Sequence, residues 1–288
     1  MTQDATTAIR IEHIEIALPG GRFDVAVAGP RDGTVVLLLH GFPQTRHTWR
    51  DVLPALAGAG FRAAAPDQRG YSPGARPNGV EAYDTGALLG DALTLADALG
   101  AERFHLVGHD WGGQLSWLLA DQHPQRIRSL AILSRPHPTA FRGAMLADPA
   151  QANRSRHHRA FMDPDTADRL LADDARGLRA LFGAETIPAD AMAAYVARLQ
   201  EPGALNAALN WYRAAARAGA QAISPGPIRV PTLYLWGTED ATVGRAAAEG
   251  TRACVEAPYR FVEIPGAGHF LTDDSGPVVV RELLHFLA

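Results

Sequence analysis

Apolar residues recur along this chain with two different periods. Runs in which they are continuous or alternate with polar residues predict strands, because successive strand side chains point to opposite faces. Such runs cover residues 14–18, 23–27, 34–39, 61–65, 104–107, 127–133, 232–236 and 259–264. Ile9 and Ile11 alternate out of phase with the first run. That shift predicts a bulge or a break near His13.

Helical patterns separate most of these runs. They lie near residues 49–57, 85–99 and 114–121, and a final helix is expected over 278–287. The run at 34–39 is almost entirely apolar, as in a strand covered on both faces. Strands that alternate with helices predict an α/β fold with a mostly parallel, doubly wound sheet.

The strand pattern is interrupted between residues 135 and 227. Apolar residues there have helical spacing and no buried strand is visible. We therefore predict a core made of residues 1–134 and 228–288, and a helical cap over 135–227 inserted after the sixth strand. Ligands of such sheets bind beyond the carboxyl ends of the strands.

Composition excludes several classes of protein. The 288 residues carry 27 basic and 31 acidic side chains, a net charge of −4, which argues against a nucleic-acid partner. No lysine occurs, so a Schiff-base lysine is excluded. The single cysteine, Cys254, excludes an internal disulfide and a cysteine metal cluster. Since neither a signal-peptide pattern nor a stretch of ~20 apolar residues is present, we expect a cytoplasmic protein without a membrane partner.

The segment GHDWGG at 108–113 follows a predicted strand and has the form of a nucleophile elbow. In this motif, flanking glycines prevent clashes at a sharp turn from strand to helix. The nucleophile position is Asp110. An aspartate that only caps the following helix would account for the same residue. Only the interpretation of Asp110 as a nucleophile requires the other residues of a catalytic site to occur elsewhere in the chain.

Further candidate residues follow other predicted strands. Asp240 lies in WGTED (236–240) and His269 in GAGH (266–269), while Glu239 competes with Asp240 for the role of the acid. In HGFP (40–43), a glycine turn can direct a backbone N–H at the elbow. The chain order of nucleophile, acid and histidine is that of α/β hydrolases.

These motifs make the chain resemble the epoxide hydrolases of the α/β-hydrolase fold over nearly its whole length. The matching segments are HGFPQT at 40–45, DQRGYS at 67–72, GHDWGG at 108–113, LNWYR at 209–213, WGTED at 236–240 and GAGH at 266–269. HGFP and GHDWGG indicate the branch with an aspartate nucleophile, and LNWYR indicates epoxides within it.

The resemblance implies a covalent mechanism. A carboxylate with a reference pKa of about 3.9 is ionised at neutral pH, so Asp110 can attack a strained ring without a base. His269 would then activate water to hydrolyse the resulting ester, and Asp240 would orient His269. The backbone N–H groups of Phe42 and Trp111 would form the oxyanion hole, and Trp111 would also line the pocket.

Ring opening also needs an acid at the epoxide oxygen. Tyr212, in LNWYR, matches the family's lid tyrosine. Most members have a second lid tyrosine, but none occurs in residues 153–161. By register, His157 takes that position, and His158, which we also expect to contact substrate, is the alternative. Both histidines could equally be solvated or packing residues.

Two other functions compete with this one. A haloalkane or haloacetate dehalogenase shares most motifs, but haloalkane enzymes commonly have Asn where this chain has Phe42. Haloacetate enzymes carry arginines at the positions of Trp111 and Gln114. A non-catalytic binding protein of the same fold would have an incomplete triad, whereas all three members are present. We expect a small apolar epoxide and water as substrates, no metal and no cofactor; the oligomeric state is not evident.

Overall fold

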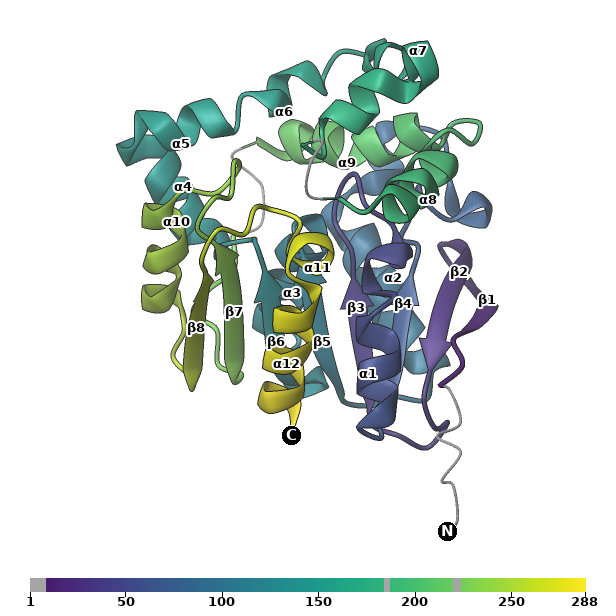
Figure 1. The fold of residues 1–288 in the computed structure, drawn as a ribbon, viewed down its shortest axis with the longest axis vertical. Coiled ribbons are helices and arrows are strands. Elements are labelled where there is room, and N and C mark those ends of the chain that lie inside the picture. The colour runs from purple at the N-terminus through teal and green to yellow at the C-terminus, as the bar shows by residue number, and fades with distance from the viewer. Residues whose placement is uncertain (1–8, 184–186, 220–223) are drawn as a thin grey trace.

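The computed structural model describes residues 9–183, 187–219 and 224–288, and its core is one mostly parallel sheet (Figure 1). The strand order is β1-β2-β4-β3-β5-β6-β7-β8, and β1 and β2 are the antiparallel members. The strands are β1 (Glu12–Leu18), β2 (Gly21–Ala28), β3 (Val35–Leu39), β4 (Arg62–Pro66), β5 (Phe104–His109), β6 (Ile127–Leu133), β7 (Thr232–Gly237) and β8 (Tyr259–Ile264). The predicted α/β fold is confirmed.

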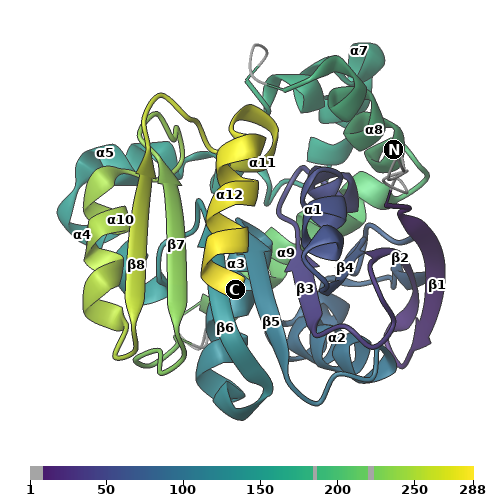
Figure 2. The ribbon, with the colours of Figure 1, turned by 60° about the horizontal axis from the view of Figure 1, so that its bottom comes forward.

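Helices cover both faces of the sheet. Helices α1 (Val52–Gly58) and α12 (Gly276–Leu287) lie on one face, and α2 (Thr85–Ala98) and α3 (Trp111–Gln122) lie on the other (Figure 2). Within β3, Val36 and Leu38 belong to the core beneath α1 and α12, while Leu37 and Leu39 belong to the core beneath α2 and α3. This double coverage explains the continuous apolar run in β3.

The first strand begins later than the full apolar pattern. Strand β1 starts at Glu12, and its Ile14 and Ile16 are half-buried against the core. Ile9 lies outside the strand and is 43% exposed. The phase shift near His13 therefore marks the start of the strand, not a bulge within it.

A helical insert separates β6 from β7 and lies across one end of the sheet (Figure 1). Its helices are α4 (Pro138–Ala147), α5 (Pro149–Arg154), α6 (His157–Ala160), α7 (Thr166–Ala180), α8 (Ala189–Leu199) and α9 (Ala204–Ala218). Two short helices, α10 (Arg245–Gly250) and α11 (Leu271–Asp274), follow β7 and β8. The insert thus stands after the sixth strand, as the change of pattern predicts.

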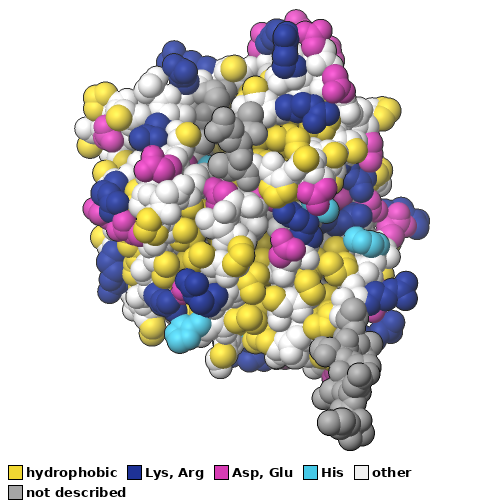
Figure 3. All heavy atoms as spheres, in the orientation of Figure 1, with side chains coloured by type: hydrophobic (Ala, Val, Ile, Leu, Met, Phe, Trp, Pro, Cys, Tyr) yellow, Lys and Arg dark blue, Asp and Glu magenta, His cyan; other side chains and the backbone are white. Residues whose placement is uncertain are grey.

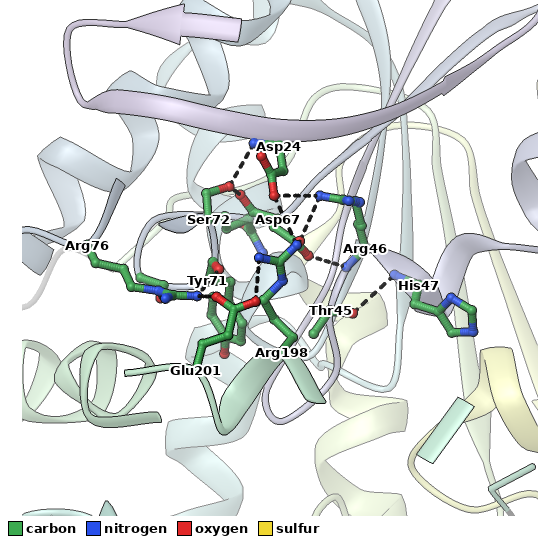
Figure 4. Close-up of polar contacts among 12 residues, drawn as sticks. Asp24, Thr45, Arg46, His47, Asp67, Tyr71, Ser72, Arg76, Arg198 and Glu201 are labelled. Carbon is green, nitrogen blue, oxygen red and sulfur yellow. Dashed lines mark hydrogen bonds and ion pairs between the residues drawn. The ribbon is translucent and has the colours of Figure 1, made fainter. Parts of the chain in front are cut away.

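A network of arginines and aspartates joins α8 of the insert to the sheet (Figure 4). Arg198 of α8 places Nη2 2.9 Å from Asp24 Oδ2 and 3.2 Å from Asp67 Oδ2. Arg46 reaches the same Asp67 oxygen at 2.8 Å. Since Asp67 is almost fully buried, two arginines compensate one desolvated carboxylate.

The DQRGYS loop after β4 provides a second contact with the insert. Arg69 forms a bidentate ion pair with Asp91 of α2, with both distances 2.7 Å. The Arg69 carbonyl accepts a hydrogen bond from Trp211 Nε1 in α9 at 2.9 Å. The loop therefore fixes α9 over the sheet. Within the described ranges, no helix is long and apolar enough to cross a lipid bilayer.

Candidate active site

The turn between β5 and α3 holds Asp110 in a strained backbone conformation. Its φ is 49° and its ψ is −113°, a region that non-glycine residues rarely adopt. A Cβ atom on Gly108 would overlap the Ser116 side chain, and one on Gly112 would overlap the Leu39 carbonyl. Both glycines are therefore required for so sharp a turn, which makes residues 108–112 a nucleophile elbow rather than an ordinary helix cap.

The two oxygens of Asp110 have different surroundings. Oδ1 accepts a hydrogen bond from the Phe42 backbone N–H at 3.0 Å. Oδ2 lies 3.6 Å from His269 Nε2. Strands β3 and β5 are paired with Leu39 opposite Gly108, which brings the loop after β3 to the elbow. A Cβ on Gly41 would overlap the Asp110 side chain, so this close approach needs glycine there.

Asp240 and Thr242 orient the imidazole of His269. Nδ1 lies 2.9 Å from Asp240 Oδ2 and 2.7 Å from Thr242 Oγ1. Asp240 Oδ1 accepts hydrogen bonds from the Thr242 N–H at 2.7 Å, the Thr242 hydroxyl at 2.8 Å and the Val243 N–H at 2.9 Å. These contacts hold the proton on Nδ1 and leave Nε2 directed at Asp110.

The backbone of His269 is held as firmly as its ring. Its carbonyl accepts hydrogen bonds from Ser134 Oγ at 2.7 Å and from His109 Nε2 at 2.9 Å. Burial, followed by the charge of His269, lowers the pKa of His109 to about 4. His109 is therefore neutral at physiological pH and positions the loop that carries His269.

Asp110 and His269 form a buried ion pair. Burial opposes the charge on Asp110, but the nearby charge of His269 outweighs it and holds the pKa of this carboxyl well below its usual range. Burial likewise opposes the charge on His269, yet Asp240 and Asp110 raise its pKa to about 10. At neutral pH the Asp110 carboxyl is ionised and the imidazole of His269 is positively charged.

Tyr212 of α9 lies above this pair among aromatic rings. Its ring centroid is 4.8 Å from that of Phe161, 5.0 Å from Trp111, 5.4 Å from His158 and 5.5 Å from Phe42. Burial and the charge of Asp110 raise the pKa of Tyr212 well above that of a free phenol. The phenol keeps its proton at neutral pH, as a hydrogen-bond donor must.

The two histidines predicted for the second donor position begin α6. His157 is the first residue of this helix, but its side chain lies outside the described residues. His158 is half-buried and lines the same cavity as Asp110 and Tyr212. The predicted role of His157 therefore stays untested, and His158 stands next to the tyrosine.

The cavity has two lobes that meet at the candidate nucleophile. The lobe toward His269 has a volume of about 300 Å³, and the lobe toward α2 has about 430 Å³. The residues common to both are Asp110, Arg135, His158 and Tyr212. The site thus combines a carboxylate, a phenol and a base behind the carboxyl ends of β5, β7 and β8.

Known proteins resemble the chain in sequence and in structure. The family model for the α/β-hydrolase fold matches residues 34–275. Epoxide hydrolase A of Mycobacterium tuberculosis is 36% identical, over 93% of this chain and 94% of that protein. The AB hydrolase superfamily protein YfhM of Bacillus subtilis is 35% identical, over 91% of this chain and 93% of its own length.

A solved structure with a similar fold is that of an epoxide hydrolase. It belongs to a set of novel epoxide hydrolases from metagenomes of hot environments, with a TM-score of 0.87, 30% identity, and coverage of 97% of this chain and 99% of that one. The chain belongs to the epoxide hydrolases of the α/β-hydrolase fold. The family resemblance inferred from the motifs is confirmed.

Two residues of this epoxide hydrolase's site escaped the sequence analysis. Thr242 contacts both Asp240 and His269, and it lies two residues after Asp240 in the spacing of an Asx turn. Arg135 follows the end of β6 and lines both lobes. The rule that sites lie beyond strand ends, applied to β6 as well, would have found it. Among the residues described, no cluster of three or more His, Cys, Asp or Glu could hold a metal ion.

Proposed function

We propose that this hydrolase opens an epoxide to a vicinal diol through an ester on Asp110. The observation that carries the proposal is the Asp110 carboxylate, which has one oxygen on a backbone N–H and the other near His269, in a cavity that it shares with the buried phenol of Tyr212. Relatives named for epoxide hydrolysis support the substrate class.

In the first step, Asp110 Oδ2 attacks a ring carbon and the carbon–oxygen bond of the epoxide breaks. Oδ2 is the nucleophile because Oδ1 is engaged by the Phe42 N–H. Tyr212 gives a proton or a hydrogen bond to the ring oxygen, whose negative charge would otherwise oppose ring opening. We keep His157 as the second donor, with His158 as the alternative.

In the second step, water attacks the carbonyl carbon of the ester. The bond from that carbon to the substrate oxygen then breaks, and this oxygen takes the remaining proton of the water and leaves as the second hydroxyl of the diol, so that Asp110 is a carboxylate again. His269 takes the proton of that water through Nε2, and Asp240 stabilises the imidazolium that forms. The Phe42 N–H and the N–H of Trp111, the first residue of α3, hold the oxyanion on Oδ1. Because ester formation removes the charge of Asp110, the pKa of His269 falls. The imidazolium then releases its proton, which replaces the one that Tyr212 gave to the ring oxygen, and the neutral imidazole becomes a base.

The helical insert serves as the cap of this reaction. We divide the chain into a core of residues 1–134 and 228–288 and a cap of residues 135–227. Tyr212 and Phe161 of the cap lie against Phe42 of the core, so the substrate would be enclosed between them. The aromatic lining favours an epoxide with a small apolar body. The cytoplasmic location stays a prediction.

Single-turnover mass spectrometry of the His269→Gln variant tests this proposal. Removing the base should stall the second step, so that styrene oxide leaves an adduct of its own mass on the peptide that carries Asp110. The matched control is Asp110→Asn, which should give no adduct. An adduct only with 1-chlorobutane or chloroacetate would replace the proposal with a dehalogenase, and none from any substrate would contradict covalent catalysis at Asp110.

A further inference from the structure

One arginine of the active-site cavity forms no ion pair with a carboxylate among the described residues. Arg135 lies two residues after the end of β6 and lines both lobes together with Asp110. The preceding Ser134 has a φ of 57°, which marks a strained turn at the end of the strand. In the described part of the chain, no Asp or Glu lies within 4.0 Å of its guanidinium, unlike that of Arg46, Arg69 or Arg198.

The contacts of Arg135 leave one edge of the guanidinium unused. Nε and Nη2 both donate to Gln114 Oε1, at 3.1 and 2.8 Å. The face of the group lies over the Phe141 ring, 4.6 Å from its centroid. One amide and one ring thus fix the plane of the group. The edge formed by Nη1 and the second N–H of Nη2 makes no hydrogen bond to the described residues, and this edge matches a carboxylate bidentately.

The charges that line the cavity have one sign apart from the nucleophile. Among the described lining residues, Asp110 is the one carboxylate. The cationic lining residues are Arg135, Arg154 and Arg159, to which the protonated His269 adds. The outer surface differs, since arginines and acidic side chains are interspersed over the face in Figure 3 and the net charge is −4.

We propose that Arg135 makes the enzyme selective for epoxides that carry a carboxylate, which it binds through its Nη1–Nη2 edge. This inference rests on the proposed function, because it assumes that the ring is opened at Asp110. The charge of Asp110 stabilises Arg135 without an ion-pair contact, and an anionic substrate supplies such a contact when it binds. Burial lowers the pKa of Arg135, in agreement with a partner that arrives only with substrate.

The positive lining also explains how an anion could approach an ionised nucleophile. The charge of Asp110 repels a substrate carboxylate, whereas Arg135 and the imidazolium of His269 attract it. Once the ester has formed, the charge of Asp110 is gone. The substrate carboxylate then remains as the negative partner of Arg135. Haloacetate enzymes, in which arginines stand at the positions of Trp111 and Gln114, would hold a shorter acid from different positions.

The test compares two epoxides that differ in one group, 3-phenylglycidate and 3-phenylglycidol. For the wild-type enzyme we expect a higher kcat/KM with the acid. Arg135→Met should raise KM and lower kcat/KM for the acid about 30-fold, the range of hydrogen bonds to charged groups. For the alcohol the change should stay below about threefold. Arg135→Lys, which keeps the charge but not the fork, should recover part of the loss.

The matched control is Arg142→Met, which removes an exposed arginine of α4 away from the cavity lining. It should leave both substrates unaffected. Cinnamate, which has the same carbon skeleton without the ring oxygen, should inhibit the wild type competitively and the Arg135→Met variant much less. Inhibition by cinnamate measures binding alone, so it can be determined even for a variant with slow turnover.

The outcomes separate this inference from the proposed function. Equal losses for acid and alcohol in Arg135→Met, or a wild type that prefers the alcohol, would overturn the carboxylate assignment and leave epoxide hydrolysis standing. No diol from either compound or from styrene oxide would overturn the proposed function itself. Hydrolysis of the acid that depends on Arg135, with the alcohol unaffected, supports both.

Discussion

The chemistry of single residues here depends on how each is desolvated and paired. Tyr212 is almost fully buried near Asp110, and both effects raise the pKa of its phenol. His269 is buried beside two carboxylates, and their charges raise its pKa to about 10. Tyr212, the proposed acid, therefore keeps its proton at neutral pH. In the proposed mechanism, His269 becomes available as the base only after Asp110 has been esterified.

Replacing Tyr212 by Phe should slow the first step much more than the second. The variant keeps the aromatic packing against Phe161 and Trp111 but loses the donor to the ring oxygen. General-acid assistance contributes typically 10²–10⁴-fold, so we expect alkylation to fall by about 10². Rapid-quench mass spectrometry of the Asp110 peptide measures it directly. An unchanged alkylation rate would remove Tyr212 from the mechanism.

The same assay assigns the second donor. His157→Ala should reduce alkylation by about tenfold if His157 donates to the ring oxygen, as one of two donors. His158→Ala is the matched comparison, because His158 lies beside Tyr212. Loss in His158→Ala alone would transfer the role to His158, and loss in neither would leave Tyr212 as the only tested donor.

At the level of elements, α8 attaches the cap to the sheet through ionic contacts. Arg198 contacts Asp24 of β2 and Asp67 after β4 (Figure 4). Tyr195 of the same helix donates a hydrogen bond to Asp273 Oδ2 at 2.8 Å. Helix α9, which carries Tyr212, contacts the loop after β4 through Trp211. The position of the phenol over the nucleophile therefore depends on the docking of both helices.

Arg198→Met should loosen this docking. Asp67 would keep Arg46 as a partner but lose one of two compensating charges, at a cost of about 1–3 kcal/mol in the free energy of unfolding. Urea unfolding monitored by tryptophan fluorescence measures that loss. Arg169→Met, which breaks an exposed pair with Asp163 in the cap, is the control and should lower the free energy of unfolding much less than Arg198→Met. Equal effects of the two variants would contradict the anchoring role.

For the whole molecule, the buried ion pair links stability to pH. The pKa of His269 is raised from an unfolded value near 6.5 to about 10 in the folded protein. Its contribution is therefore fully present below pH about 6.5 and is lost as pH rises toward 10. Tyrosines with raised pKa values, such as Tyr83 at about 12, affect stability only at higher pH.

We expect the free energy of unfolding of the wild type to fall between pH 7 and pH 9.5, by an amount on the order of 3 kcal/mol. His269→Gln should be less stable at pH 7 and should show a much flatter profile over this window. Urea titrations at four or five pH values measure both. A wild-type profile as flat as that of the variant would contradict a protonated His269 in the folded enzyme.

Much of the architecture follows from local patterns in the chain. Continuous apolar runs such as 34–39 identify strands that are covered on both faces, and the glycines around Asp110 identify a sharp turn after a strand. These features can be predicted from the sequence because each depends on residues that are close together along the chain. The sequence also predicts the chain order of Asp110, Asp240 and His269 and the position of each residue after a strand.

Packing between segments that are distant in the sequence determined the remaining features of the site. Separate strand ends meet in a buried site, and three features arise there. His269 lies 3.6 Å from Asp110, Thr242 contacts the imidazole, and His269 is protonated. Arg135 occupies an unremarkable position in the sequence, just before two prolines. Only the fold places it in the cavity with Gln114 as its partner, because contacts between segments that are distant in the sequence are properties of the assembled site.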